Sequence, residues 1–236
     1  MPSTLAFDDF KPYTLTCELR YDNAYLVFDR TGQLVTDVRD SFTNVSVASA
    51  VPQQSAFSAD EGNFNVELNA ARFTSGRVDR TGELFAKHCS VLFDAVVERL
   101  EINVFTRIGI RYILRKDFAT DAEAKEALAS MMLTSLKPVK RFNASEHPTE
   151  VAFRWEDDQV GAFVRLKAET TDIKVVVPVE MQDTIPKFEK KVNGLTLDID
   201  YYTVARVERE QWSCREWLPS KLRVIRKEVD SILRGN

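Results

Sequence analysis

Histidine, cysteine and glycine are all scarce in this sequence, which has two, three and eight of them among 236 residues. A serine-type catalytic triad would have to use His88 or His147, and no Gly-x-Ser-x-Gly elbow is present. The glycines form neither a GxGxxG fingerprint nor a Walker loop, so the usual backbone cradles for dinucleotides and nucleoside triphosphates are missing. The cysteines show no CxxC pair and no zinc-like spacing. We therefore find no catalytic motif, and we expect neither a cofactor nor a metal.

Long apolar runs are absent as well. No stretch approaches the roughly 20 residues that a membrane-spanning helix needs, and residues 1–13 lack the basic start and apolar segment of a secretory signal. Cys17 and Cys89 lie within apolar patterns, which favours buried free thiols. We therefore expect a cytoplasmic protein with no membrane partner. The net charge of −4 argues against a surface built throughout for nucleic acid.

Hydrophobic residues make up 44% of the chain and charged residues 29%, which is typical of a soluble globular protein with a sizeable core. Alternating apolar and polar residues predict four strands and one loop in the first half. The strands are expected at 13–21, 24–30, 33–38 and 64–68, and the loop at 51–62. Apolar residues then recur every three or four positions over 84–100, which predicts a long amphipathic helix. A capping box at Thr120 and Glu123 opens a shorter helix.

The second half repeats this theme. Strands are expected at 150–155, 160–168, 172–179 and 195–202, the last one entered by a turn at Asn193-Gly194. A C-terminal helix has one apolar stripe, formed by Leu218, Leu222, Ile225 and Val229. The sequence therefore predicts an α+β fold of two similar halves, residues 1–136 and 137–236. Each half is expected to be a curved antiparallel sheet packed on a long amphipathic helix, and the two to form one compact unit.

The most informative segment is 104–115, where residues alternate between the two faces of a predicted strand. The apolar face consists of Val104, Ile108, Ile110, Tyr112 and Leu114. The other face carries Gly109, which leaves a gap between two guanidinium groups, and three arginines, Arg107, Arg111 and Arg115. Such a strand needs carboxylates, an anionic ligand or water beside its arginines. We call residues 104–115 the arginine strand.

The strand expected at 195–202 complements the arginine strand, because Asp198 and Asp200 share its polar face. If the two strands face each other, Arg111 would pair with Asp198 or Asp200 in a charge-assisted, bidentate geometry. This structural ion pair, which would fix how the two halves dock, is the favoured interpretation. Two others stay open: Arg107, Arg111 and Arg115 could form a site for phosphate, carboxylate or nucleotide, or the paired aspartates could hold a divalent cation.

These two strands resemble the markers of an uncharacterised, sporadically distributed bacterial protein family of about this length. Its members carry a mid-chain strand of the form R-hydrophobic-G-hydrophobic-R-Y after a long helix, and later a hydrophobic-D-hydrophobic-D strand before a C-terminal helix. The matching positions are Arg107, Gly109, Arg111, Tyr112, Asp198 and Asp200. The chain departs from the pattern in two respects: Leu114-Arg115 stand where an Asn is expected, and the C-terminal helix lacks the usual His. The resemblance implies no activity, since the family has none assigned, but its patchy distribution implies defence-linked gene neighbourhoods.

Two surfaces are candidates for partners. Trp212 and Trp217 flank the start of the C-terminal helix, and with Arg223 and Arg226 of its basic outer face they form a candidate interface. A nucleic-acid contact is the weaker candidate; it would use the C-terminal helix together with Lys137, Lys140 and Arg141.

These features favour a non-enzymatic binding or accessory protein of a bacterial defence or toxin-type operon, with a protein partner or a second copy of itself. The alternative is an enzyme or sensor that binds a small phosphorylated or nucleotide ligand through the arginine strand. Arg107 and Arg111 would then clamp the anion, and Asp198 or Asp200 would act as base or metal ligand. A binding protein predicts arginines and aspartates that satisfy each other. An enzyme needs an open cavity in which at least one arginine lacks a carboxylate.

Overall fold

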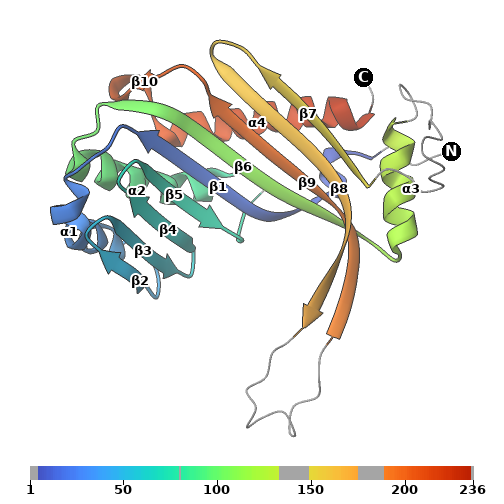
Figure 1. Cartoon of the computed structure of the whole chain (residues 1–236), viewed down its shortest axis with the longest axis horizontal. Helices are drawn as coiled ribbons and strands as arrows, with labels where there is room; N and C mark the ends of the chain where they lie inside the picture. Colours follow the sequence, from blue (N-terminus) through green and yellow to red (C-terminus); the bar gives the residue numbers. More distant parts are fainter. Residues whose placement is uncertain (1–4, 80, 133–148, 175–188, 235–236) are drawn as a thin grey trace, which may run out of the picture.

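The computed structural model describes residues 5–79, 81–132, 149–174 and 189–234. These residues form one ten-stranded antiparallel sheet with helices packed against it (Figure 1). The helical elements are η1 (Phe7–Asp9), α1 (Val27–Arg39), α2 (Glu83–Leu100), α3 (Asp121–Met132), η3 (Arg209–Gln211) and α4 (Cys214–Arg234). The strands are β1 (Lys11–Tyr21), β2 (Ser46–Val51), β3 (Gln54–Ala59), β4 (Gly62–Glu67), β5 (Ala70–Ser75), β6 (Val104–Phe118), β7 (Glu150–Glu156), β8 (Val160–Lys174), β9 (Glu189–Thr203) and β10 (Val207–Glu208).

The strand order is β2-β3-β4-β5-β1-β6-β9-β8-β7, and β10 pairs with β6. The α+β class is therefore confirmed. A separate sheet in each half is not, because β6 pairs with β9 from Gly109–Tyr202 to Phe118–Asn193, across the expected boundary between residues 136 and 137. The long strand β6 lies at the centre of the sheet, where it pairs with β1 along one edge and with β9 along the other. Outward from this centre, the first strand of each side is followed by the others in reverse chain order, as β1-β5-β4-β3-β2 and as β6-β9-β8-β7, with one strand fewer on the second side.

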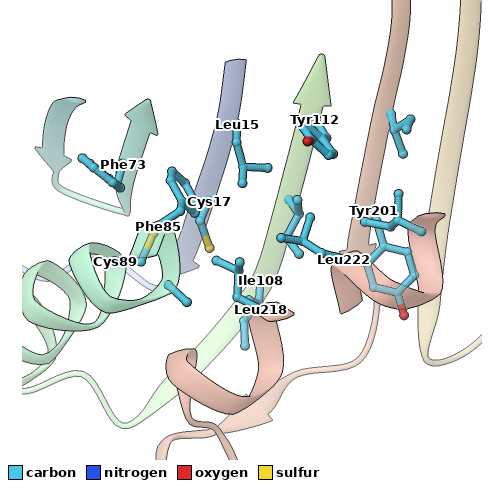
Figure 2. Packing of buried hydrophobic residues seen from close by; sticks show 14 of the residues in the cluster. Leu15, Cys17, Phe73, Phe85, Cys89, Ile108, Tyr112, Tyr201, Leu218 and Leu222 are labelled. Carbon is cyan, nitrogen blue, oxygen red and sulfur yellow. The ribbon is translucent and has the colours of Figure 1, made fainter. Parts of the chain in front are cut away.

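The hydrophobic core lies between the sheet and the helices α2 and α4 (Figure 2). Leu15 and Cys17 of β1 and Ile108 of β6 are fully buried, as are Cys89 of α2 and Leu218 of α4. All three cysteines are free and buried, as the sequence predicts for Cys17 and Cys89. None of the described helices is long and apolar enough to cross a membrane.

Gly82 lies where the start of α2 approaches α4. It precedes α2 with a φ of 72°, in the left-handed region that favours glycine. A Cβ atom at this position would lie 2.2 Å from Cδ1 of Leu222 on α4. A side chain at this position would adopt a strained backbone conformation and would displace the end of the Leu222 side chain.

Helix α1 replaces the strands expected at 24–30 and 33–38, so that prediction is wrong. Its buried residues are spaced by four, three and four positions, which is the period of a helix: Val27, Thr31, Leu34 and Val38. Each shorter window also fits an alternating pattern, and this ambiguity misled the prediction.

Three other boundaries differ from the predicted ones. The expected loop at 51–62 is largely the hairpin of β2 and β3, which buries Phe57. Strand β8 is continuous through 160–174, where two strands were expected, and Asn193-Gly194 lies inside β9. In β9, Gly194 is flanked by Glu169 and Asp117 of the neighbouring strands, which hold it extended rather than in a turn. Residues 137–148 and 175–179 lie outside the described residues, and with them Lys137, Lys140 and Arg141.

Candidate functional site

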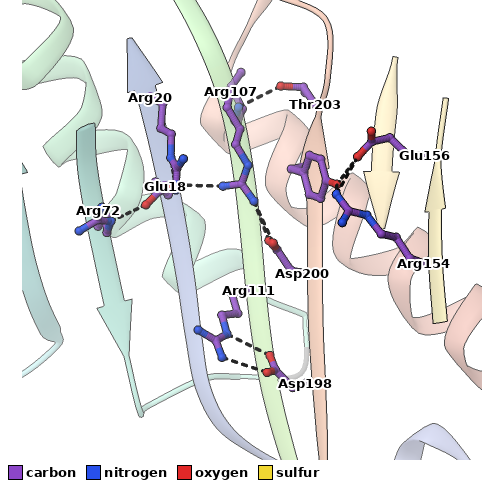
Figure 3. Close-up of polar contacts among 12 residues, drawn as sticks. Glu18, Arg20, Arg72, Arg107, Arg111, Arg154, Glu156, Asp198, Asp200 and Thr203 are labelled. Atoms are coloured by element: carbon purple, nitrogen blue, oxygen red, sulfur yellow. Dashed lines mark hydrogen bonds and ion pairs between the residues drawn. The ribbon is translucent and has the colours of Figure 1, made fainter. Parts of the chain in front are cut away.

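The arginine strand is the first part of β6, and its charged side chains lie on the face of the sheet opposite α2 and α4 (Figure 3). A bulge in β6 separates the pairs Arg20–Arg107 and Tyr21–Phe105, so Phe105 is buried in the core where alternation predicts Val104. Beyond the bulge the predicted alternation holds. The charged side chains form two groups, one around Arg107 and one around Asp198.

Arg107 bridges three strands. Its Nη1 donates to Oε1 of Glu18 on β1 at 2.9 Å, and its Nη2 donates to both carboxylate oxygens of Asp200 on β9 at 2.9 and 3.0 Å. The guanidinium also lies 4.6 Å from the ring centroid of Tyr202, a favourable cation–π distance. Gly109 makes room for it, because a Cβ there would lie 2.5 Å from Nη1 of Arg107. The predicted gap beside Gly109 is thus filled by the guanidinium itself.

Glu18 collects three arginines at the centre of the sheet. Besides Arg107, it accepts a 2.6 Å hydrogen bond from Nε of Arg20 and another from Nε of Arg72. Burial by itself raises the pKa of this carboxyl, but the hydrogen bonds and charges of Arg72 and Arg20 outweigh it and hold the pKa below its usual value. We call Glu18, Arg20, Arg72, Arg107 and Asp200 the Arg107 cluster.

Asp198 is the centre of the second group. Arg111 binds it in a bidentate fashion, with Nε to Oδ1 at 3.0 Å and Nη2 to Oδ2 at 2.9 Å, and Arg165 of β8 adds a 2.9 Å bond to Oδ2. Asp198 is only 8% exposed, whereas Arg111 is 53% exposed. Burial raises the pKa of Asp198, but its hydrogen bonds to Arg111 and Arg165 bring the pKa below the usual value. We call Arg111, Arg165 and Asp198 the Asp198 cluster.

Strand register alone does not decide the partner of Arg111. The residue directly opposite is Asp200, yet Arg111 binds Asp198, which lies diagonally across from it. Asp200 is already bound by Arg107, so the four charges form two separate pairs, Arg107 with Asp200 and Arg111 with Asp198.

Arg115 completes the arginine strand without meeting either aspartate. It donates to Asp117 at 3.0 Å, to the hydroxyl of Thr171 at 3.0 Å and to the carbonyl of Val192 at 2.8 Å. Each arginine of the strand therefore has partners within the chain. No group of histidine, cysteine or carboxylate side chains suited to a metal ion occurs in the described ranges.

Sequence reasoning missed Glu18, Arg20, Arg72 and Arg165 as members of these clusters, and Tyr202 as the ring beside Arg107. For Glu18 a signal was available, since the alternation at 13–21 places it on the polar face of a strand. Arg165 and Tyr202 could be placed only by knowing that β8 pairs with β9, and this pairing cannot be read from the sequence.

The candidate interface of Trp212, Trp217, Arg223 and Arg226 does not form one surface. Trp212 packs on Phe105 with ring centroids 5.2 Å apart, so it pins the chain to the sheet. Arg223 and Arg226 instead line a cleft of about 720 Å³ on the helix side. Its floor contains Phe7, Tyr112 and Leu222, which are buried.

Trp217 also faces inward. Its ring centroid lies 6.4 Å from that of Tyr201, and it packs against the core with only part of its surface exposed. In the cleft, Arg226 is bound to Asp8 by hydrogen bonds of 2.8 and 2.6 Å. The two tryptophans thus anchor α4, and the two arginines lie along its outer side.

Two exposed aromatic residues stack on each other on β7, apart from the exposed Tyr13, Tyr25 and Phe28 of the first half. Trp155 is 48% exposed and Phe153 is 37% exposed, and their rings stack with centroids 5.7 Å apart. Beside them a mostly apolar groove of about 360 Å³ runs between α4 and strands β7, β8 and β9. Val224, also exposed, lies on its α4 side. Phe153 and Trp155 could not be singled out from the sequence, because they continue the ordinary alternation of β7.

No family model matches this chain, and no curated protein is significantly similar to it in sequence.

Proposed function

We propose that this chain is a non-enzymatic binding protein, in which the charged face of the sheet is architectural and the partner binds the groove between α4 and strands β7–β9. The observation that supports the first part is the pairing of the arginine strand. Arg107, Arg111 and Arg115 each donate hydrogen bonds to groups of the same chain. A guanidinium whose charge is balanced by a neighbouring carboxylate attracts an anionic substrate less strongly than an unpaired one.

The groove supports the second part of the proposal. Trp155 and Val224 line the groove and are exposed, and Phe153, also exposed, lies beside Trp155. Aromatic side chains are enriched where proteins bind each other, and a contiguous apolar surface of this kind marks interaction sites. The groove is also built on a strand and a helix, so it is formed before a partner arrives.

We further propose that the chain consists of two similar halves, which the reversed strand order on both sides of the sheet supports, although the second side has one strand fewer. In the first half, α1 packs beside α2 and over β2 and β3. In the second half, the side chains that line the groove beside α4 come from α4 and β7–β9. Helix α3 follows β6 as α1 follows β1, and it packs on β8, β9 and β6.

Thermal melting of the wild type and of Arg111→Ala, with and without inorganic phosphate, pyrophosphate and nucleotides, tests the architectural role. We expect a lower melting temperature for the variant and no anion-dependent shift in either protein, since the charges are internally paired. A stabilising shift in the wild type that Arg111→Ala loses would instead establish an anion site on the arginine strand and favour the enzyme or sensor.

A second candidate place for a small anionic ligand is the cleft lined by Arg223, Arg226 and Arg215 over its apolar floor. The same melting series separates it from the arginine strand. A shift that survives Arg111→Ala but disappears in Arg223→Ala would assign the ligand to this cleft.

The family resemblance adds the proposal that the protein acts in the cytoplasm of a bacterium, within a defence or toxin-type operon. Three free, buried cysteines are consistent with a reducing compartment. Co-expression with the products of neighbouring genes tests this, with Val224→Arg as the groove variant. We expect one of these products to co-purify with the wild type and to be lost from the variant.

A further inference from the structure

Strand β7 is an edge of the sheet, and β8 is its one partner among the described strands. Its hydrogen-bonding pattern follows from two bonds. The amide of Ala168 donates to the carbonyl of Thr149 at 2.8 Å, and the amide of Asp157 donates to the carbonyl of Val160 at 3.0 Å. Because bonding alternates along an antiparallel ladder, the odd-numbered residues from 149 to 157 bond to β8. The N–H and C=O groups of Glu150, Ala152 and Arg154 therefore point to the free edge.

The side chains of β7 alternate in the same way. Val151, Phe153 and Trp155 lie on the helix face of the sheet, next to the groove. Glu150, Ala152 and Arg154 lie on the charged face and are exposed. Among the described residues the edge-facing backbone groups of β7 have no partner strand, and such an edge with exposed aromatic residues is a template for another strand.

We propose that β7 pairs with β7 of a second copy of this chain, antiparallel about a two-fold axis at Ala152. This inference rests on the proposed function: it identifies a second copy of the chain as a partner that binds at β7, beside the groove. Ala152 then faces Ala152 of the second copy, and Glu150 faces Arg154 on either side. Each of these pairs uses backbone groups that point to the free edge, so each exchanges two hydrogen bonds.

The side chains favour this register on both faces of the sheet. On the charged face, Glu150 meets Arg154 of the second copy twice, which is a favourable cross-strand pair of opposite charges. Arg154 already donates to Glu156 and Tyr202 at 3.3 Å, and its five N–H groups leave donors for Glu150. On the helix face, Val151 meets Phe153 of the second copy, a β-branched residue against an aromatic one. The two-fold repetition joins these into one apolar cluster.

Other registers are worse. An axis at Phe153 places Glu150 against Glu156, and an axis at Arg154 places that arginine against itself. An axis at Trp155 pairs Arg154 with Glu156, but it leaves the edge groups of Glu150 and Ala152 unpaired. The opposite edge, β2, is no substitute, because pairing β7 with β2 of the next copy is head-to-tail and would extend into a fibre.

Sedimentation velocity of the full chain is the first test. We expect a species of twice the 26.9 kDa chain mass, in concentration-dependent exchange with the monomer. Arg154→Glu places glutamates against Glu150, and Glu150→Arg places arginines against Arg154, so each variant should weaken the dimer at least tenfold. The double variant E150R/R154E restores opposite charges and should dimerise like the wild type. Arg39→Glu, an exposed charge reversal on α1, is the matched control and should leave the dimer unchanged.

Mixing the two single variants is the sharpest measurement. A chain with Glu at 150 and 154 and a chain with Arg at both positions are complementary along this register, so equal amounts should form a heterodimer. A wild type that stays monomeric at about 100 μM, assemblies larger than a dimer, or single variants that dimerise alone as well as the wild type would each overturn the proposal. The groove variant Val224→Arg should keep the dimer while losing a partner protein, so failure of this pairing is distinguishable from failure of the proposed function.

Discussion

Arg107 donates a 2.9 Å hydrogen bond to Glu18, and this contact joins β6 to β1 at the centre of the sheet (Figure 3). The same guanidinium binds Asp200 on the other neighbouring strand, β9. One side chain therefore links the strands that precede residue 136 to those that follow it. Arg107 is 21% exposed, less than half the exposure of Arg111, so solvent can replace its contacts less easily.

Arg107→Met should accordingly destabilise the fold more than Arg111→Met. Loss of Arg107 leaves Asp200 without its bidentate partner and removes one of three cations from the buried Glu18, which we expect to cost about 2 kcal/mol. Loss of Arg111 leaves Asp198 with Arg165, and the lost side chain is half exposed, so about 1 kcal/mol is expected. Urea denaturation of the two variants measures both values. Equal losses, or a larger one for Arg111→Met, would contradict this ranking.

The sequence contained the complementarity of the arginine and aspartate strands, because alternation within each strand places its charges on one face. It did not contain the pairing of individual charges. Asp200 belongs to Arg107 rather than Arg111 because Glu18 of β1 and a bulge in β6 fix where that guanidinium lies. Contacts among three strands far apart in the chain cannot be derived from the pattern of one strand.

The long helices could be predicted for a similar reason, since α2 and α4 have enough turns to separate helical from alternating periodicity. Helix α1 could not, because its first apolar residues also fit a strand. The groove beside α4 could not be predicted from the sequence either. It exists because α4 leaves Phe153 and Trp155 uncovered, and coverage is a property of the assembled layers.

Gly109→Ala should destabilise the protein through Arg107 alone. The new Cβ would lie 2.5 Å from Nη1 of Arg107, so the guanidinium must move away from Glu18 and Asp200. We expect a loss of about 1–2 kcal/mol in the wild type. In an Arg107→Met background the obstacle is absent, and alanine should be neutral or stabilising by about 0.5 kcal/mol, because glycine disfavours the extended strand. A double-mutant cycle by urea denaturation measures this coupling, and additive effects would refute it.

Acid should destabilise the fold through Asp198 and Glu18. Both carboxyls have a pKa below the usual values of 3.8 and 4.5, so they stabilise the folded state fully above those values. As the pH falls through the lowered pKa values, both become protonated and the contribution is lost. The free energy of unfolding should therefore fall between about pH 5 and about pH 3.

The variant Asp198→Asn isolates the contribution of Asp198 to this pH dependence of the free energy of unfolding. The variant should be less stable than the wild type at pH 7, because Arg111 and Arg165 lose their shared carboxylate. The difference should narrow as the pH approaches 3, where wild-type Asp198 becomes neutral. Asp40→Asn, which removes an exposed carboxylate after α1, controls for the change in net charge. If the free energies of unfolding of Asp198→Asn and the wild type differ by the same amount at every pH, Asp198 does not contribute to the pH dependence of stability.

The three thiols should report whether α4 opens independently of the rest of the fold. Cys17, Cys89 and Cys214 are buried, and burial raises the pKa of Cys89 well above its usual value, which keeps that thiol protonated and unreactive. A thiol reagent such as DTNB should react with none of them in the native state and with all three in denaturant. Leu218→Ala, which creates a cavity under α4 and should cost about 3 kcal/mol, should accelerate labelling of all three thiols in parallel if unfolding is cooperative. Labelling of Cys214 alone, located by peptide mapping, would show instead that α4 detaches while the sheet and α2 stay folded.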